Sequence, residues 1–261
     1  MGINRKRYII ANWKMNFTTG EASLFLHKLA NKIKPARDVQ TILAPSAIAL
    51  QALSLQVNRR QFKLAAQNFY WRDFGAFTGE ISAHQLRGIA DYALVGHSER
   101  RYVFCETDKE IREKVAAALR NQIIPVLCIG ETAEERKNGE TDAVIYDQLL
   151  GGLSEVSKED VDKVIVAYEP VWAISTTKGG GLAKPDDVAD AIQRVRKHIA
   201  QAYGKNHAAE ISVLYGGSVN TSNARSYLEI EGVDGLLVGG ASLVADEFSG
   251  IVEIAKGMKD E

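Results

Sequence analysis

Eight short apolar runs recur at roughly even spacing along the 261-residue chain, and this repetition most limits the folds that the chain can adopt. They occupy residues 8–11, 41–44, 62–66, 92–95, 123–128, 164–168, 211–215 and 235–238. Each run is mostly continuous rather than alternating in polarity, which is typical of strands covered on both faces, as in parallel sheets. Pro125 removes one ladder donor from the fifth run, but it lies near the start, where proline is tolerated.

Helical patterns separate these runs, and the clearest begins at Pro185, a residue type suited to the first position of a helix. Further helices are predicted from Asp108 and from about Thr19 to Lys32. A strand followed by a helix, repeated with short links, is typical of the α/β class with a parallel sheet. Eight such units in 261 residues favour a (β/α)8 barrel, in which eight parallel strands are ringed by helices and residues 1–261 form a single domain.

The composition limits which classes of binding partner and which cellular compartment we expect for this protein. The formal net charge is -1, so nothing in it demands nucleic acid or an anionic membrane surface as a partner. The two cysteines, Cys105 and Cys128, have no close spacing, which excludes a zinc cluster and a disulfide scaffold and fits a reducing compartment. The first residues lack the apolar stretch of a signal peptide, and no apolar run reaches membrane-spanning length. We therefore expect a cytoplasmic protein.

Residues 67–82 do not fit a short link, because five aromatic side chains lie in this stretch. A solvated loop should not be so apolar. Either the loop folds back on its own barrel, or it docks into another subunit, since exposed aromatic patches usually mark interfaces. Physical reasoning on the sequence leaves both alternatives open.

The chemistry of such barrels lies just behind the C-terminal ends of the strands, and three polar residues stand out there. Lys14 follows the first run and could supply positive charge for an anion. His97 follows the fourth, and a helix beginning there would keep its ring neutral. Glu169 directly follows the sixth, beside apolar walls that suit a general base. Each also has an ordinary structural explanation: a solvated lysine, a histidine bonded to backbone, and a salt-bridged carboxylate.

Glycine pairs follow the seventh and eighth runs, at residues 216–217 and 239–240. They let backbone N–H groups approach a ligand where barrels commonly hold phosphate. The sequence contains no set of metal ligands and no dinucleotide-binding fingerprint. Together with the lysine, histidine and glutamate, this favours cofactor-independent proton transfer next to the carbonyl of a small sugar phosphate. A barrel aldolase or isomerase with a Schiff-base lysine, Lys63 or Lys163, is a weaker alternative.

Seven segments in order along the chain resemble the triosephosphate isomerase family: residues 12–16, 76–82, 95–101, 126–131, 167–174, 215–219 and 237–243. The resemblance implies a TIM barrel of glycolysis and gluconeogenesis that interconverts dihydroxyacetone phosphate and D-glyceraldehyde 3-phosphate through an enediolate. It implies no metal and no cofactor. It also favours the subunit-docking alternative for residues 67–82, with Phe77 and Thr78 at the tip of the loop in a homodimer.

The same resemblance implies roles for individual residues. Glu169 would be the base and His97 the neutral electrophile, an arrangement for which the family is itself a well-known example of pKa tuning. Lys14 and Asn12 would stabilise the enediolate and position the substrate. The remaining implied residues hold the phosphate or support the catalytic groups: Ser175, Ser218, Gly239 and Gly240 for phosphate, and Glu99 and Glu131 for support.

The segment after Trp172 departs from the family. Ser175 and Thr177 stand where the usual lid has glycine, and residues 175–184 run about three residues longer, with three consecutive glycines at 179–181. Ordering three glycines costs about 1 kcal/mol or more. We hypothesise that this lid orders less readily and that more of the enediolate loses phosphate to give methylglyoxal. The alternative for the whole chain is a catalytically impaired barrel that only binds its ligand.

Overall fold

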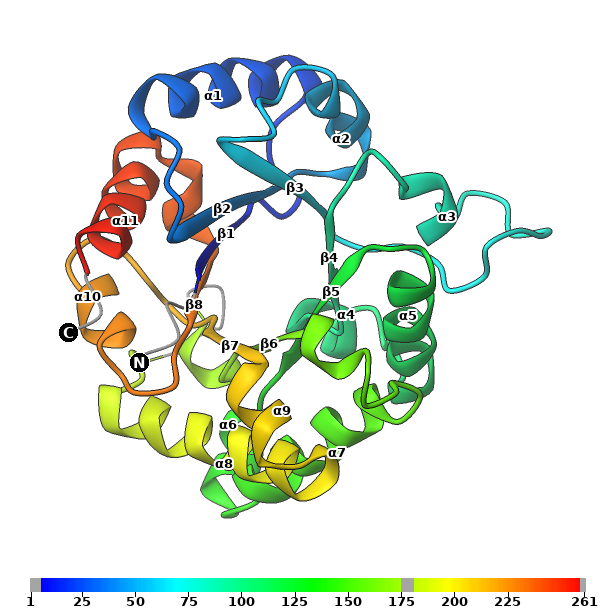
Figure 1. Cartoon of the computed structure of the whole chain (residues 1–261), viewed down its shortest axis with the longest axis vertical. Coiled ribbons are helices and arrows are strands. Elements are labelled where there is room, and N and C mark those ends of the chain that lie inside the picture. Colours follow the sequence, from blue (N-terminus) through cyan, green and yellow to red (C-terminus); the bar gives the residue numbers. More distant parts are fainter. Residues whose placement is uncertain (1–5, 175–180, 259–261) are drawn as a thin grey trace.

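The computed structural model describes residues 6–174 and 181–258, and eight parallel strands close into a barrel in sequence order (Figure 1). Each strand pairs in parallel with the next, and the first pairs with the last. The predicted fold class is therefore confirmed. The strands are β1 (Arg7–Asn12), β2 (Val39–Ala44), β3 (Phe62–Ala66), β4 (Tyr92–Val95), β5 (Ile124–Ile129), β6 (Ile165–Tyr168), β7 (Ser212–Tyr215) and β8 (Gly235–Val238).

Helices surround the barrel on its outside (Figure 1). The helix predicted over Thr19–Lys32 has those bounds, and the helices predicted from Asp108 and Pro185 begin at these residues. The α-helices are α1 (Thr19–Lys32), α2 (Ala47–Ser54), α3 (Ala83–Leu86), α4 (Ser98–Tyr102), α5 (Asp108–Arg120), α6 (Ala133–Lys137), α7 (Thr141–Leu153), α8 (Pro185–Tyr203), α9 (Lys205–Glu210), α10 (Ala224–Leu228) and α11 (Ala245–Gly257). Short 3-10 helices are η1 (Val161–Lys163), η2 (Val171–Ala173) and η3 (Gly240–Leu243).

Capping boxes define where several helices begin. Thr18 and Thr107 each accept a backbone N–H from the third residue of the helix, whose glutamate side chain accepts the N–H of the cap residue in return. The reciprocal pair satisfies two backbone donors that the helix itself cannot satisfy. Each such cap stabilises its helix by about 1 kcal/mol.

The apolar residues form two clusters on opposite faces of the strands. Along β1, Ile9 and Ala11 belong to the large cluster between strands and helices, whereas Ile10 belongs to the small cluster inside the barrel. All three side chains are fully buried. Burial on both faces explains why the strands appear in the sequence as continuous apolar runs.

Closure of the barrel depends on Gly235, the first residue of β8. Its φ is +159°, and a Cβ at this position would lie 1.9 Å from the carbonyl oxygen of Tyr8 in β1. No larger residue fits without moving one strand away from the other. Glycine is therefore required at the position where the last strand meets the first.

The segment between β3 and α3 extends away from the barrel (Figure 1). Phe69 is buried near its base, but Phe74 is 74% exposed and Phe77 39% exposed. The rings of Tyr70 and Trp71 stack at 4.0 Å, and the rings of Tyr70 and Phe77 lie 4.5 Å apart. The loop thus packs partly on itself and leaves aromatic surface uncovered. Within residues 6–174 and 181–258, no helix is long and apolar enough to cross a membrane.

Candidate active site

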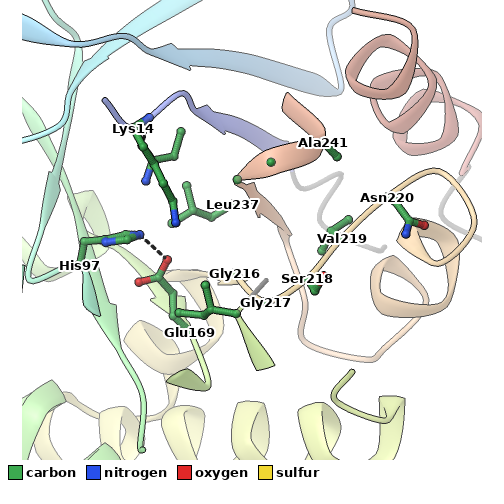
Figure 2. Close-up of a pocket in the computed structure, with 14 residues that line it drawn as sticks. Lys14, His97, Glu169, Gly216, Gly217, Ser218, Val219, Asn220, Leu237 and Ala241 are labelled. Carbon is green, nitrogen blue, oxygen red and sulfur yellow. Dashed lines mark hydrogen bonds and ion pairs between the residues drawn. The ribbon is translucent and has the colours of Figure 1, made fainter. Parts of the chain in front are cut away.

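A cavity of about 200 Å³ opens at the C-terminal ends of the strands (Figure 2). The residues that line it lie at the ends of β1, β4, β6, β7 and β8 or follow them, because the C-terminal ends of parallel strands meet at one rim. Seven of the predicted site residues line this cavity: Asn12, Lys14, His97, Glu169, Ser218, Gly239 and Gly240. Sequence reasoning did not anticipate Ile174, Val219, Asn220, Leu237 and Ala241, which complete the wall.

Lys14 reaches into the cavity from a strained backbone. Its φ is +51°, a conformation that costs a non-glycine residue about 1–2 kcal/mol. The Asn12 side chain accepts the Lys14 backbone N–H at 3.0 Å, and Gln67 donates its side-chain amide to the Lys14 carbonyl at 2.9 Å. Lys14 Nζ donates to Glu99 Oε1 at 2.7 Å. Asn12, Gln67 and Glu99 therefore fix both the backbone and the ammonium group of Lys14.

His97 is the N-cap residue of α4, so a helix does begin here, which is the condition under which the sequence favoured a neutral ring. Its Nδ1 accepts the Glu99 backbone N–H at 3.2 Å, and an accepting nitrogen carries no proton. This arrangement favours a neutral ring with its hydrogen on Nε2. The Nε2 atom lies 3.4 Å from Glu169 Oε1, on the cavity side of the ring (Figure 2).

Glu169 is 3% exposed and stands directly behind β6. Its backbone N–H donates to the Ile129 carbonyl at 2.7 Å. A Cβ at Gly130 would lie 2.0 Å from the Glu169 carbonyl oxygen, so only glycine allows the ends of β5 and β6 to approach this closely. Within the described part of the chain, Glu169 Oε2 is buried and has no hydrogen-bond partner. A carboxylate oxygen in this state is available to accept a proton from a ligand in the cavity.

Cys128, one residue before the end of β5, lies close to this carboxylate. Burial raises the pKa of the Cys128 thiol, and the charge of Glu169 raises it further. The thiol therefore stays protonated at neutral pH. It acts as a small packing residue, because the thiolate and not the thiol is the nucleophile.

The opposite side of the cavity is built from the turns behind β7 and β8. Ser218, Gly239 and Gly240 line it, and a Cβ at Gly240 would meet no atom within 4 Å. The backbone of Gly240 therefore faces open space. The Ser218 N–H donates to the Ala173 carbonyl at 3.0 Å, so this donor is engaged in the present structure. Ser175, and with it the hypothesis on the lid, lies outside the described residues.

Glu131 lies behind the cavity, under the segment that follows Glu169. It is fully buried, and its carboxylate accepts hydrogen bonds from Tyr168 Oη at 3.0 Å and from Trp172 Nε1 at 2.8 Å. Glu99 thus contacts Lys14, and Glu131 contacts the residues on both sides of Glu169. Phe77 and Thr78 do not line this cavity.

The two lysines of the alternative prediction lie elsewhere. Lys63 pairs with Asp91 at 3.3 Å, next to the start of β4, and Lys163 pairs with Asp160 at 2.6 Å on the surface. Neither lines the cavity. This placement contradicts the alternative of a Schiff-base lysine at the site. Gln67, which sequence reasoning missed, directly follows β3 and could have been found by reading the residue behind that strand.

The fold and the cavity together define an enzyme of the (β/α)8 barrel class with a site for a small anionic substrate. The sequence model of the triosephosphate isomerase family matches residues 7–255. The triosephosphate isomerase of Streptococcus mutans is 41% identical over 255 residues, covering 97% of this chain and 100% of that protein. Those of Caldanaerobacter subterraneus and Clostridium tetani are 40% and 39% identical over 249 residues, covering 95% of this chain and 99% and 96% of theirs. The chain belongs to the triosephosphate isomerase family.

Proposed function

We propose that this protein interconverts dihydroxyacetone phosphate and D-glyceraldehyde 3-phosphate by moving a proton between neighbouring carbons through an enediolate. One observation carries the proposal. An unpartnered carboxylate oxygen of Glu169, the Nε2 atom of His97 and the ammonium group of Lys14 all meet at one cavity. Such a set suits proton transfer beside a carbonyl, where one group takes the proton and two others stabilise the oxygen.

Glu169 removes the proton from one carbon and returns it to the other. The carboxylate is buried and lacks a competing hydrogen bond at Oε2 within the described residues, so water does not screen it from the substrate. As each proton leaves a carbon, negative charge develops on the neighbouring oxygen. The reaction therefore needs donors directed at that oxygen.

His97 and Lys14 supply those donors. A neutral ring with its hydrogen on Nε2 donates a hydrogen bond to the substrate oxygens. The same ring can pass a proton from one of the two oxygens to the other. Lys14 places a fixed positive charge beside the same oxygens, held by Glu99 at 2.7 Å. Asn12 fixes the Lys14 backbone and also lines the cavity.

The phosphate group binds at the other side of the cavity, at Ser218, Gly239 and Gly240. Open space over Gly240 supports this assignment, because an anion can approach the backbone there. Binding through the Ser218 N–H would require its bond to the Ala173 carbonyl to break. Neither the described residues nor the relatives offer an observation in favour of a barrel that only binds its ligand.

The protein is further proposed to act as a homodimer in the cytoplasm. Exposed Phe74 and Phe77 on an extended loop support an interface there, since a monomer rarely leaves such rings uncovered. In the dimer, Thr78 at the loop tip reaches the site of the partner subunit. Sedimentation of the parent and of Phe77→Asp checks this: dimer for the parent and monomer for the variant are expected.

The activity is tested by coupling formation of dihydroxyacetone phosphate to a reporter dehydrogenase. The parent should turn over rapidly, and Glu169→Asp, which withdraws the carboxylate by one methylene, should lower kcat by about 100-fold or more. Glu229→Asp is the matched control, because Glu229 is exposed, pairs with Arg225 on α10 and does not line the cavity. A folded parent without turnover would refute the proposal.

A further inference from the structure

We propose that Arg136 is a positioning residue that holds the backbone segment carrying Glu169 in place, acting through Trp172 and Glu131. The inference rests on the proposed function, because it concerns the placement of the base. Arg136 belongs to α6 and does not line the cavity, so it does not touch substrate.

The first step is that Glu131 accepts hydrogen bonds from residues on both sides of Glu169 in the sequence. Tyr168 directly precedes Glu169 and donates its hydroxyl to the Glu131 carboxylate at 3.0 Å. Trp172, three residues after the base, donates its indole N–H to the same carboxylate at 2.8 Å. The Val171 N–H donates to the Glu131 carbonyl at 3.0 Å. Glu131 thus binds the chain before and after Glu169.

The second step is the position of the Arg136 guanidinium. Its central carbon lies 4.3 Å from the centroid of the Trp172 ring, in cation–π geometry. Nη1 lies 3.6 Å from Glu131 Oε1, and Nη2 donates to Asp187 Oδ1 at 2.8 Å. Asp187 is in the first turn of α8. Arg136 therefore packs against the indole ring of Trp172, and its ion pair with Asp187 fixes its own position relative to α8.

The third step is the charge of Glu131. This carboxylate is fully buried, and in residues 6–174 and 181–258 Arg136 is the only cation within 4.0 Å of it. A buried carboxylate needs a compensating charge as well as hydrogen bonds. Without Arg136, Glu131 would lose this cation and keep the neutral donors of Tyr168 and Trp172, and the indole ring would lose its cation–π contact.

The consequence concerns the base rather than phosphate binding. A displaced Trp172 ring moves the short η2 segment, and Glu169 lies two residues before it. A misplacement of the base by about 1 Å is enough to slow proton transfer by up to about 100-fold. The phosphate side meets η2 through the Ser218 N–H bond to the Ala173 carbonyl, at the end of the segment away from Glu169, so kcat should change more than KM.

The experiment compares Arg136→Gln, Arg136→Lys, Trp172→Phe and the double variant R136Q/W172F. R136Q should lower kcat by about tenfold and leave KM within about twofold of the parent. R136K, which keeps the positive charge but not the planar fork, should recover part of the loss. W172F should lower kcat as well, and the double variant should be no slower than the slower single variant, since the two residues act as one unit. Arg112→Gln is the matched control, because Arg112 is also 35% exposed and pairs with Glu155 away from the cavity.

A second readout is independent of turnover. The Trp172 indole N–H signal in a ¹⁵N–¹H spectrum is assigned as the one that W172F lacks, and R136Q should shift it while R112Q should not. A parent-like signal in R136Q would overturn the inference, as would parent-like kcat with a lowered melting temperature, which indicates a structural role alone. Independent, multiplying effects of R136Q and W172F on kcat would also overturn it. A folded parent without turnover refutes the proposed function, and the indole signal then still decides whether Arg136 holds Trp172.

Discussion

The two ends of the barrel differ in how their polar groups are paired. At the N-terminal end, Arg59 binds Asp91 at 2.6 Å and the carbonyls of Gly88 and Ile89. A second pair, Arg196 and Asp234, lies 2.7 Å apart in front of β8, and Asp234 also accepts the backbone N–H of Val213. Each pair ties the segment in front of a strand to its neighbours.

The C-terminal end keeps groups unpaired. Within the described residues, Glu169 Oε2, the Tyr215 hydroxyl and the Trp13 indole N–H are buried without a hydrogen-bond partner. Lys14 adds a strained backbone at the same end. Glu169 and Lys14 both line the cavity, and since an unpartnered buried oxygen and a strained backbone reduce stability, we attribute these two features to function. The comparison indicates that one end of the barrel serves stability and the other serves the reaction.

The largest effect should come from neutralising the base at the C-terminal end. Glu169→Gln should lower kcat by about 1,000-fold or more, because an amide cannot accept the proton. Its free energy of unfolding should stay within about 1 kcal/mol of the parent or rise, since the variant removes a buried charge whose Oε2 has no hydrogen-bond partner among the described residues. Coupled kinetics and urea unfolding on the same preparation measure both. A large loss of stability would break the comparison.

The opposite outcome is expected at the N-terminal end. Asp234→Ala should lower the free energy of unfolding by about 3 kcal/mol, because Arg196 loses its nearly buried partner and the Val213 N–H loses its acceptor. The kcat of the folded variant should remain close to the parent value. Asp190→Ala is the control, since Asp190 forms an exposed pair with Arg194 and should cost less than about 0.5 kcal/mol. An Asp234→Ala enzyme that is stable but slow would contradict the division between the ends.

A pH dependence of stability should arise from Cys128. Burial raises the pKa of this thiol in the folded state, so the unfolded chain releases its proton at lower pH than the folded protein does. The stabilisation is fully present below the unfolded pKa of about 8.5 and is lost as pH rises above it, by up to about 1.4 kcal/mol per pH unit. Unfolding free energies of the parent and of Cys128→Ser between pH 8 and 10 test this. The parent should show the steeper decline, and equal slopes would exclude the thiol as its source.

The smallest effect should come from Cys105→Gly, which distinguishes backbone strain outside the cavity from backbone strain at the cavity residue Lys14. Cys105 has a φ of +56° and is exposed, and it does not line the cavity. Cys105→Gly should stabilise the protein by about 0.5–1 kcal/mol without changing kcat, because glycine adopts this conformation freely. Thermal melts and coupled kinetics measure both. Lys14→Gly relieves comparable strain but should abolish turnover, and a slow Cys105→Gly enzyme would show that strain at position 105 also matters to the reaction.

The sequence predicted the barrel because burial on both faces leaves a continuous apolar signal in each strand. It also predicted the cavity, because parallel strands bring Lys14, His97 and Glu169 to one rim whatever the details of the loops. The sequence did not predict contacts between residues of different helices. Arg136 meets Trp172 and Asp187 because the fold brings α6 close to η2 and to the first turn of α8, and no spacing along the sequence records this approach. The bond from the Ser218 N–H to Ala173 was hidden for the same reason.

Gly235 has a consequence for how the protein is made. It admits β8 against β1, so the first strand to leave the ribosome pairs on one side with the last. Until about residue 238 has emerged, β1 and the growing end of the sheet present unpaired backbone edges, which other chains can bind. A side chain at position 235 would leave this seam open after synthesis is complete. The absence of a Cβ at residue 235 thus lets β8 cover the exposed edge of β1 as soon as β8 has been synthesised, which shortens the exposure of the nascent barrel to aggregation.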